Sequence, residues 1–153
     1  MSTDNGNNER ILQLDEYWPY LLTVLADRIA RHTTKIVKEK GLNLSQWRVL
    51  AAIAEKPGRT SVEVVTITPM DKGIVSRATK ALLLLGLIRR EASQLDGRIS
   101  HLYLTAAGMT VYRQLFPQVE AILQCADVGL SKDQQQRLGH QLQALIAVIP
   151  DLR

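Results

Sequence analysis

The chain has 153 residues, of which 46% are hydrophobic, a length that suits one domain with its own core. Its net charge of +4 fits a polyanionic partner only weakly, because many soluble proteins are equally basic. A single cysteine excludes an intramolecular disulfide framework, and no apolar run approaches the roughly 18 residues that a membrane span needs.

The N-terminal segment is polar and lacks the basic and then apolar pattern of a signal peptide. We therefore expect residues 1–10 to form a disordered tail, and the protein to be cytoplasmic with no membrane partner. A first helix is expected from about Leu12 to Lys40, where Gly41 ends it. Its apolar residues recur at helical spacing as one stripe: Leu14, Trp18, Leu21, Leu22, Leu25 and Ile29.

Two capping signatures mark the next helices. Asn43 is followed at the third position by Gln46, and Thr60 is followed at the third position by Glu63. The first predicts a helix that ends before Pro57-Gly58. The second predicts a short helix from Ser61 to about Ile67.

A basic helix is expected after Asp71, whose short carboxylate suits the N-cap position. At 100° per residue, one side is apolar: Ile74, Val75, Ala78, Ala81, Leu82 and Leu85. The opposite side carries small and cationic residues: Lys72, Gly73, Ser76 and Lys80, with Arg77 on the flank. Leu83 and Leu84 fall toward the exposed side, and Gly86 closes the helix.

Two strand-like segments follow, 87–91 and 99–104, with Asp96-Gly97 as the turn between them. Arg89 and Arg90 alternate sides on the first strand, so at most one is expected to face the polyanionic partner that these cations suit. Residues 71–103 hold six cations and three anions, which places three of the four net charges in about a fifth of the chain.

Two long helices complete the chain. Thr105 caps one expected from Ala106 to Asp127, with Pro117 as the point of any kink. Ser131 begins the last helix, with Gln134 in capping-box register. Residues 11–42 and 106–153 form amphipathic helices, and the unit 43–105 does not need this much additional apolar helix surface to bury its core. We therefore expect these two segments to form a dimerisation region, and the chain to pair with itself.

This arrangement resembles the MarR (multiple antibiotic resistance regulator) family of winged helix-turn-helix transcription factors. Three stretches carry the resemblance: Gln46-Trp47-Arg48-Val49-Leu50; Met70-Asp71-Lys72 with Val75-Ser76-Arg77-Ala78; and Asp96-Gly97-Arg98 with Leu104-Thr105-Ala106-Ala107-Gly108. The resemblance implies a mainly α fold with a small β-wing, and a homodimer that binds double-stranded DNA. It also implies that Asp96 holds the Arg98 guanidinium through a charge-assisted hydrogen bond.

The candidate DNA-binding residues follow from chemistry as well as from the resemblance. A small face at Gly73 and Ser76 permits close approach to a major groove, while Lys72, Arg77 and Lys80 can reach phosphates or guanine edges. Arg98, at the tip of the hairpin, suits a narrow and electronegative minor groove. The alternative is that the charged face of this helix contacts only water and binds no partner.

The sequence predicts a ligand-responsive repressor that binds a palindromic operator. Non-specific architectural DNA binding and redox sensing through Cys125 are the alternatives. Relatives that bind small aromatic acids suggest an aromatic carboxylate or phenolic effector. Its candidate contacts are Tyr17, Trp18, Tyr20, Arg31, His32 and Trp47. The histidines show no metal-ligand spacing, and no nucleophile elbow, phosphate loop or carboxylate pair is present, so no metal, cofactor or enzymatic activity is expected.

Overall fold

The computed structural model describes residues 9–124 and 129–153. Within these ranges it contains six α-helices, one short 3-10 helix and an antiparallel pair of strands. The elements in chain order are α1 (Trp18–Lys38), α2 (Leu44–Glu55), α3 (Ser61–Ile67), α4 (Lys72–Leu84), β1 (Ile88–Ala92), β2 (Ser100–Leu104), α5 (Ala106–Glu120), η1 (Ala121–Leu123) and α6 (Lys132–Val148).

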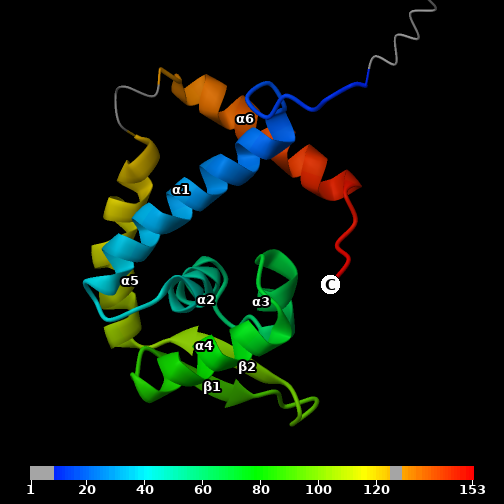
Figure 1. Cartoon of the computed structure of the whole chain (residues 1–153). Helices are drawn as coiled ribbons and strands as arrows, with labels where there is room; N and C mark the ends of the chain where they lie inside the picture. The colour runs from blue at the N-terminus through cyan, green and yellow to red at the C-terminus, as the bar shows by residue number, and fades with distance from the viewer. Residues whose placement is uncertain (1–8, 125–128) are drawn as a thin grey trace, which may run out of the picture.

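Two regions are visible in Figure 1. Helices α2, α3 and α4 gather with the two strands into one compact unit, and α1 and α6 cross at the opposite end of the molecule. Helix α5 runs along one side and joins the two regions. A mainly helical fold with a small sheet is therefore confirmed.

The local capping signals are confirmed. Asn43, Thr60 and Ser131 each close a reciprocal capping box with the residue three positions later. In each box the side-chain oxygen of the cap residue accepts from the backbone N–H three positions later. The side chain at that later position accepts in turn from the backbone N–H of the cap residue. These bonds need only neighbours in sequence, so the helix starts follow from the local pattern.

The first helix begins later than expected. The pattern predicted a start near Leu12, whereas α1 starts at Trp18, and Leu14 lies in a preceding turn. Pro19 explains the difference, because it has no N–H to donate to the carbonyl of Asp15 and is tolerated only within the first helical turn.

The helix after the wing ends earlier than expected. It was predicted to reach Asp127, but α5 ends at Glu120 and continues as the short helix η1 to Leu123. Pro117 lies inside α5 and removes one backbone donor three residues before that end. Cys125 lies outside the described residues.

The hydrophobic core lies in the compact unit. Val49, Leu50 and Ile53 of α2 pack with Val75 and Leu82 of α4, and all five are fully buried. Trp47 is also buried and stacks on Tyr112 of α5, with ring centroids 5.6 Å apart. Helix α1 contributes Val37 to this core, whereas α6 has no buried residue.

The hairpin pairs Ile88 with Leu104 and Ala92 with Ser100 at its two ends. Backbone from the α2–α3 loop extends this sheet: Gly58 N–H donates to Leu102 O at 2.8 Å, and Leu102 N–H donates to Arg59 O at 2.9 Å. The wing is therefore fixed to the loop that follows α2.

The junction between wing and α5 is built around Thr105 and Gly108. The Thr105 hydroxyl donates to Gly86 O at 2.6 Å and accepts from Gly108 N–H at 3.0 Å. A Cβ on Gly108 would lie 1.9 Å from Leu87 O, closer than any side chain allows. The spacing Leu104-Thr105-x-x-Gly108 is thus required by this close contact. None of the described helices is both long enough and apolar enough to span a membrane.

Candidate nucleic-acid interface

Helix α4 is held by a cap at one end and by the core along one side. Asp71 Oδ1 accepts from Ile74 N–H at 2.7 Å, and the carboxylate also favours the positive end of the helix dipole. Val75, Ala78 and Leu82 are buried, as the spacing predicted. Leu85 differs, because it follows the last turn of α4 and is 55% exposed.

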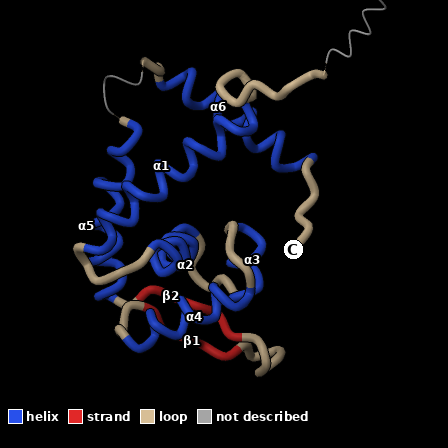
Figure 2. The backbone as a smooth tube through the Cα atoms, in the orientation of Figure 1, coloured by secondary structure: helices blue, strands red, loops and turns tan. Residues whose placement is uncertain are grey.

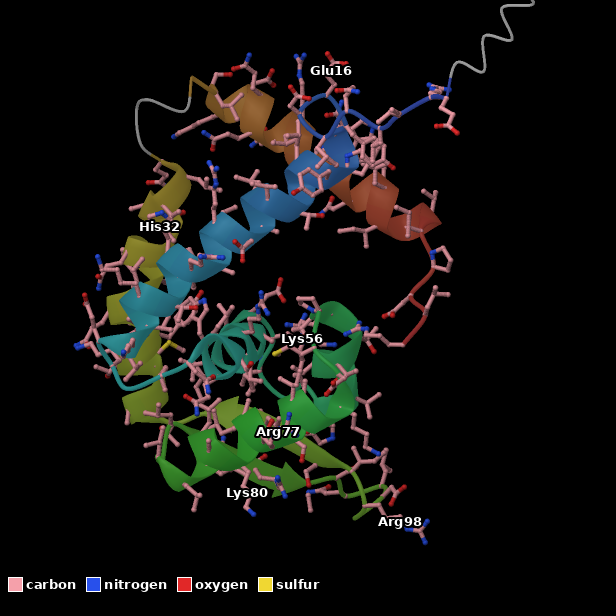
Figure 3. The ribbon with its side chains drawn as sticks, in the orientation of Figure 1. Glu16, His32, Lys56, Arg77, Lys80 and Arg98 are labelled. Carbon is pink, nitrogen blue, oxygen red and sulfur yellow. The ribbon has the colours of Figure 1, made fainter. Side chains whose placement is uncertain are left out.

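The predicted DNA-facing residues of α4 all lie on its exposed side. Lys72, Gly73, Ser76, Arg77 and Lys80 are exposed, and Lys80 projects from the outer edge of the molecule (Figure 3). A Cβ on Gly73 would lie 3.3 Å from both Arg77 Nη1 and Asp71 Oδ1. Gly73 therefore leaves room for the Arg77 guanidinium to lie back along the helix toward the N-cap.

The wing presents Arg98 at its tip, away from α1 and α6 (Figure 3). Ser93 N–H donates to Ile99 O at 2.8 Å and Ile99 N–H donates to Asp96 O at 3.0 Å, which closes the turn. The expected contact between Asp96 and the Arg98 guanidinium is wrong. Asp96 Oδ1 instead accepts from the backbone N–H of Arg98 at 3.0 Å, and among the described residues no ion pair joins the two side chains. Asp96 thus shapes the turn, because a short carboxylate suits the N–H two residues on.

The two arginines of β1 have different environments. Arg89 lies 4.5 Å above the Tyr103 ring, its partner in the strand register, and also pairs with Glu91. Arg90 points to the other face, where it lines a groove with residues of α3 and α4. The alternation predicted that at most one of the pair faces DNA. The structure identifies Arg90 as the one on the side of α4.

A continuous cationic groove joins α4 to the wing. One cavity of about 320 Å³ has an apolar floor and a polar edge, and is lined by Val62, Val65, Val75, Ser61, Lys72, Ser76, Thr79 and Arg90. A neighbouring cavity of about 510 Å³ shares Arg90 and reaches Arg98. Sequence reasoning missed Ser61 and Thr79. Thr79 is 2% exposed, and its hydroxyl has no hydrogen-bond partner in the described part of the chain.

At the opposite end, α1 and α6 line an apolar cavity of about 750 Å³. Its residues are almost all hydrophobic: Trp18, Leu21, Leu22, Leu25, Leu138, Gln141, Leu142, Ala144, Leu145 and Val148. Trp18 is 53% exposed and Ile146, nearby on α6, is 75% exposed. This surface is far more apolar than water favours for an isolated subunit.

The structure does not bring the six candidate effector residues together. Trp18 lines the apolar cavity between α1 and α6, whereas Tyr17 lines a surface hollow beside residues 10–16. Arg31 lies thirteen residues along α1 from Trp18, roughly 20 Å by helix rise. It is 78% exposed and pairs with Asp27 at 2.9 Å. Tyr20 and His32 are also exposed.

Trp47 lies in a separate cleft of about 450 Å³ where α2, α5 and the α3–α4 turn meet. Arg48 lines the same cleft and was not predicted as a site residue. Partial burial lowers the pKa of its guanidinium, which indicates a charge removed from part of its water. Arg48 has no hydrogen bond or ion pair among the described residues. No group of three or more described His, Cys, Asp or Glu side chains is placed to hold a metal ion.

Comparisons with known proteins agree with this geometry. Residues 40–99 match the model of the MarR family. The homoprotocatechuate degradative operon repressor of Escherichia coli is 26% identical over 117 residues, which span 74% of this chain and 76% of the repressor.

Solved structures extend the likeness to nearly the whole fold. A MarR-family transcriptional regulator from Silicibacter pomeroyi is 29% identical with a TM-score of 0.82, covering 92% of this chain and 97% of that one. Bordetella bronchiseptica BpsR, solved to explain how 6-hydroxynicotinic acid regulates its DNA binding, is 21% identical with a TM-score of 0.77, covering 91% and 99%. The match over residues 40–99 and the likeness of the whole fold show that the chain is similar to the MarR family of transcriptional regulators.

Proposed function

We propose that the protein is a repressor that binds a palindromic operator as a homodimer and leaves it when an aromatic carboxylate or phenolic ligand binds. The observation that carries the DNA half of this proposal is the cationic groove from Lys72 through Arg90 to Arg98. The exposed face of α4 is narrow at Gly73 and Ser76, so it fits a major groove. Arg98 then lies far enough along the wing to reach the adjacent minor groove.

The dimer half of the proposal is supported by the apolar surface of α1 and α6. Leu21, Leu25 and Leu138 are each more than 40% exposed in the subunit. A second copy of the chain offers an identical apolar surface, which is the self-complementarity that a two-fold interface requires. Two α4 helices related by that axis read half-sites about one helical turn, ~10 bp, apart.

The effector is best accommodated by the cleft at Trp47. Trp47 and Tyr112 supply aromatic walls, and Arg48 supplies a partly desolvated guanidinium that can pair with a carboxylate in two places. Of the residues expected from sequence, only Trp47 lines this cleft. The cleft also touches Thr68 and Pro69 of the turn before α4, so a ligand here contacts that turn together with α2 and α5. The control of BpsR by 6-hydroxynicotinic acid is a precedent in a protein of the same fold.

The DNA proposal is tested by gel shift on the DNA upstream of the protein's own gene. We expect a specific complex that random DNA does not displace at equal concentration. Arg77→Ala should weaken it by roughly 1–3 kcal/mol if Arg77 pairs with a base. Equal displacement by random and upstream DNA would instead favour a non-specific architectural protein.

The effector proposal is tested by thermal-shift measurements with a set of aromatic acids and phenols. A ligand that stabilises the protein should also lower its affinity for DNA, because release requires preference for the conformation that does not fit both half-sites. Arg48→Ala should abolish the stabilisation by carboxylates, while Arg31→Ala, a matched loss of one exposed arginine, should not. Stabilisation that survives Arg48→Ala places the ligand elsewhere.

Redox control through Cys125 is the remaining alternative. It predicts that peroxide lowers DNA affinity in the wild type and has no effect on Cys125→Ser. We expect peroxide to leave DNA binding unchanged, because the sequence around Cys125 is apolar and has no neighbouring cation to stabilise a thiolate.

A further inference from the structure

The turn between α3 and α4 has one backbone donor fewer than an ordinary turn, because it contains Pro69. Helix α3 ends at Ile67, and its C-cap Thr68 is extended, with φ −119° and ψ 156°. The next residue, Pro69, has no N–H, so the carbonyl of Val65 cannot receive the helical bond from residue 69. The Thr68 hydroxyl donates to Val64 O at 2.7 Å, which satisfies only one of the free carbonyls.

Arg153, beyond the end of α6, supplies the missing donors. Its Nη1 donates to Thr68 O at 2.8 Å and to Met70 O at 2.7 Å, and its Nη2 lies 3.3 Å from Val65 O. These partners are 83 to 88 positions away in sequence. Three carbonyls thus converge on one planar guanidinium, an arrangement that arginine suits and a single ammonium does not.

Asp151 holds this guanidinium in place from the other side. Arg153 Nε donates to Asp151 Oδ1 at 3.0 Å and Nη2 donates to Oδ2 at 2.6 Å, a two-point pairing. Leu152 between them is 93% exposed and plays no part in this contact. The segment from Ile149 to Arg153, which we call the strap, therefore attaches to the turn through polar groups alone.

The strap is attached next to the residue that caps α4. Figure 2 shows the chain running from the end of α6 to the side of α3. Met70, whose carbonyl Arg153 binds, is 1% exposed and immediately precedes Asp71, the N-cap of α4. The attachment thus lies one residue from the start of the candidate recognition helix, while the other end of the strap continues from the apolar surface of α6.

We propose that Arg153 is a positioning residue for α4, and that the strap transmits movement of α6 to the turn that begins this helix. The partners are all within the chain and the bonds are directional, so a shift or rotation of α6 changes the position of the turn or breaks the attachment. Any effect of this coupling on DNA binding rests on the proposed function. The coupling between α6 and α4 itself does not depend on that function.

Amide hydrogen exchange of Ile74 and Val75, whose N–H groups both donate to Asp71, tests the attachment directly. Arg153→Ala should speed exchange of these amides several-fold, while the core amides of α2 remain unchanged. Arg153→Lys should not restore protection, because an ammonium keeps the charge but cannot serve the three carbonyls and Asp151 together. Leu152→Ala is the matched control and should behave as wild type. Unchanged exchange in Arg153→Ala, or full protection in Arg153→Lys, would overturn the proposal.

A double-mutant comparison tests the coupling itself. Ile146→Gly loosens α6 at an exposed position seven residues before Arg153, and should speed exchange of Ile74 and Val75 in the wild-type background. In the Arg153→Ala background the same change should add little, because the connection is already lost. Fully additive effects would exclude transmission through the strap. Gel shifts of the same variants form a separate arm: if the wild type itself fails to bind upstream DNA, the proposed function is wrong and the exchange result still decides on Arg153.

Discussion

Gly108 is the residue whose identity the fold restricts most sharply. A methyl group there would meet the backbone oxygen of Leu87, which the pairing of Thr105 N–H with the same oxygen holds in place. Gly108→Ala should therefore destabilise the protein by about 1–3 kcal/mol, despite the better helix propensity of alanine. Urea unfolding measures this loss. Gly97→Ala is the control, since a Cβ at Gly97 meets nothing within 4 Å and stability should stay within about 0.5 kcal/mol.

Asp151 provides a residue-scale prediction about pH. Hydrogen bonds from Arg153 lower the pKa of this carboxyl from 3.8 to about 2. A carboxyl with a lowered pKa in the folded state adds stability that is fully present above pH 3.8 and is lost as the pH falls through about 2. NMR titration should find a midpoint near 2 in the wild type and near 3.8 in Arg153→Ala. A low midpoint that persists without Arg153 would show another cause.

At the scale of elements, strand β1 places its two arginines on opposite faces, and only Arg90 lines the groove beside α4. Arg90→Ala should weaken DNA binding and reduce the salt dependence by about one unit of slope, as expected for one lost phosphate contact. Arg89→Ala should leave both nearly unchanged, because that guanidinium is engaged by Tyr103 and Glu91 on the other face. Gel shifts at several salt concentrations make the comparison. Equal losses from the two variants would contradict the assignment of Arg90 to the groove.

The elements also show how far sequence reasoning reaches. The helix starts at Asn43, Thr60 and Ser131 could be predicted because each capping box lies within four residues of chain. The choice between Arg89 and Arg90 needed the pairing of β1 with Tyr103 of β2, which the alternation alone does not give.

Longer-range contacts were beyond the pattern altogether. Arg153 binds backbone carbonyl groups more than eighty positions away. Every residue has such a carbonyl, so the sequence cannot show which ones accept these bonds. Arg48 lines a cleft that exists only after α2 packs against α5. The expected effector cluster on α1 failed to assemble for the same reason: Arg31 is close to His32 in sequence, but its helix face turns toward solvent and Asp27.

At the scale of the whole molecule, the apolar surface of α1 and α6 predicts the oligomeric state. Leu142 lines this surface from α6. Leu142→Arg should convert the dimer to a monomer at micromolar concentration, because a buried unpaired charge costs several kcal/mol across two symmetric copies. Sedimentation velocity measures the change, with Arg137→Ala on the same helix as a control that remains dimeric. A wild-type protein that sediments as a monomer would sink the prediction.

The absence of any buried residue from α6 has a consequence for the life of the protein in a cell. None of the 17 residues of α6 is fully buried in the subunit, so few tertiary contacts stabilise this helix there, and helices depend mainly on such contacts. If the proposed dimer forms, a newly made subunit without a partner would expose α6 to proteases, and pairing would protect it. Degradation then falls as the amount of protein rises, so that low expression is removed quickly and higher expression persists. The supply of the regulator would in this way respond steeply to its rate of synthesis.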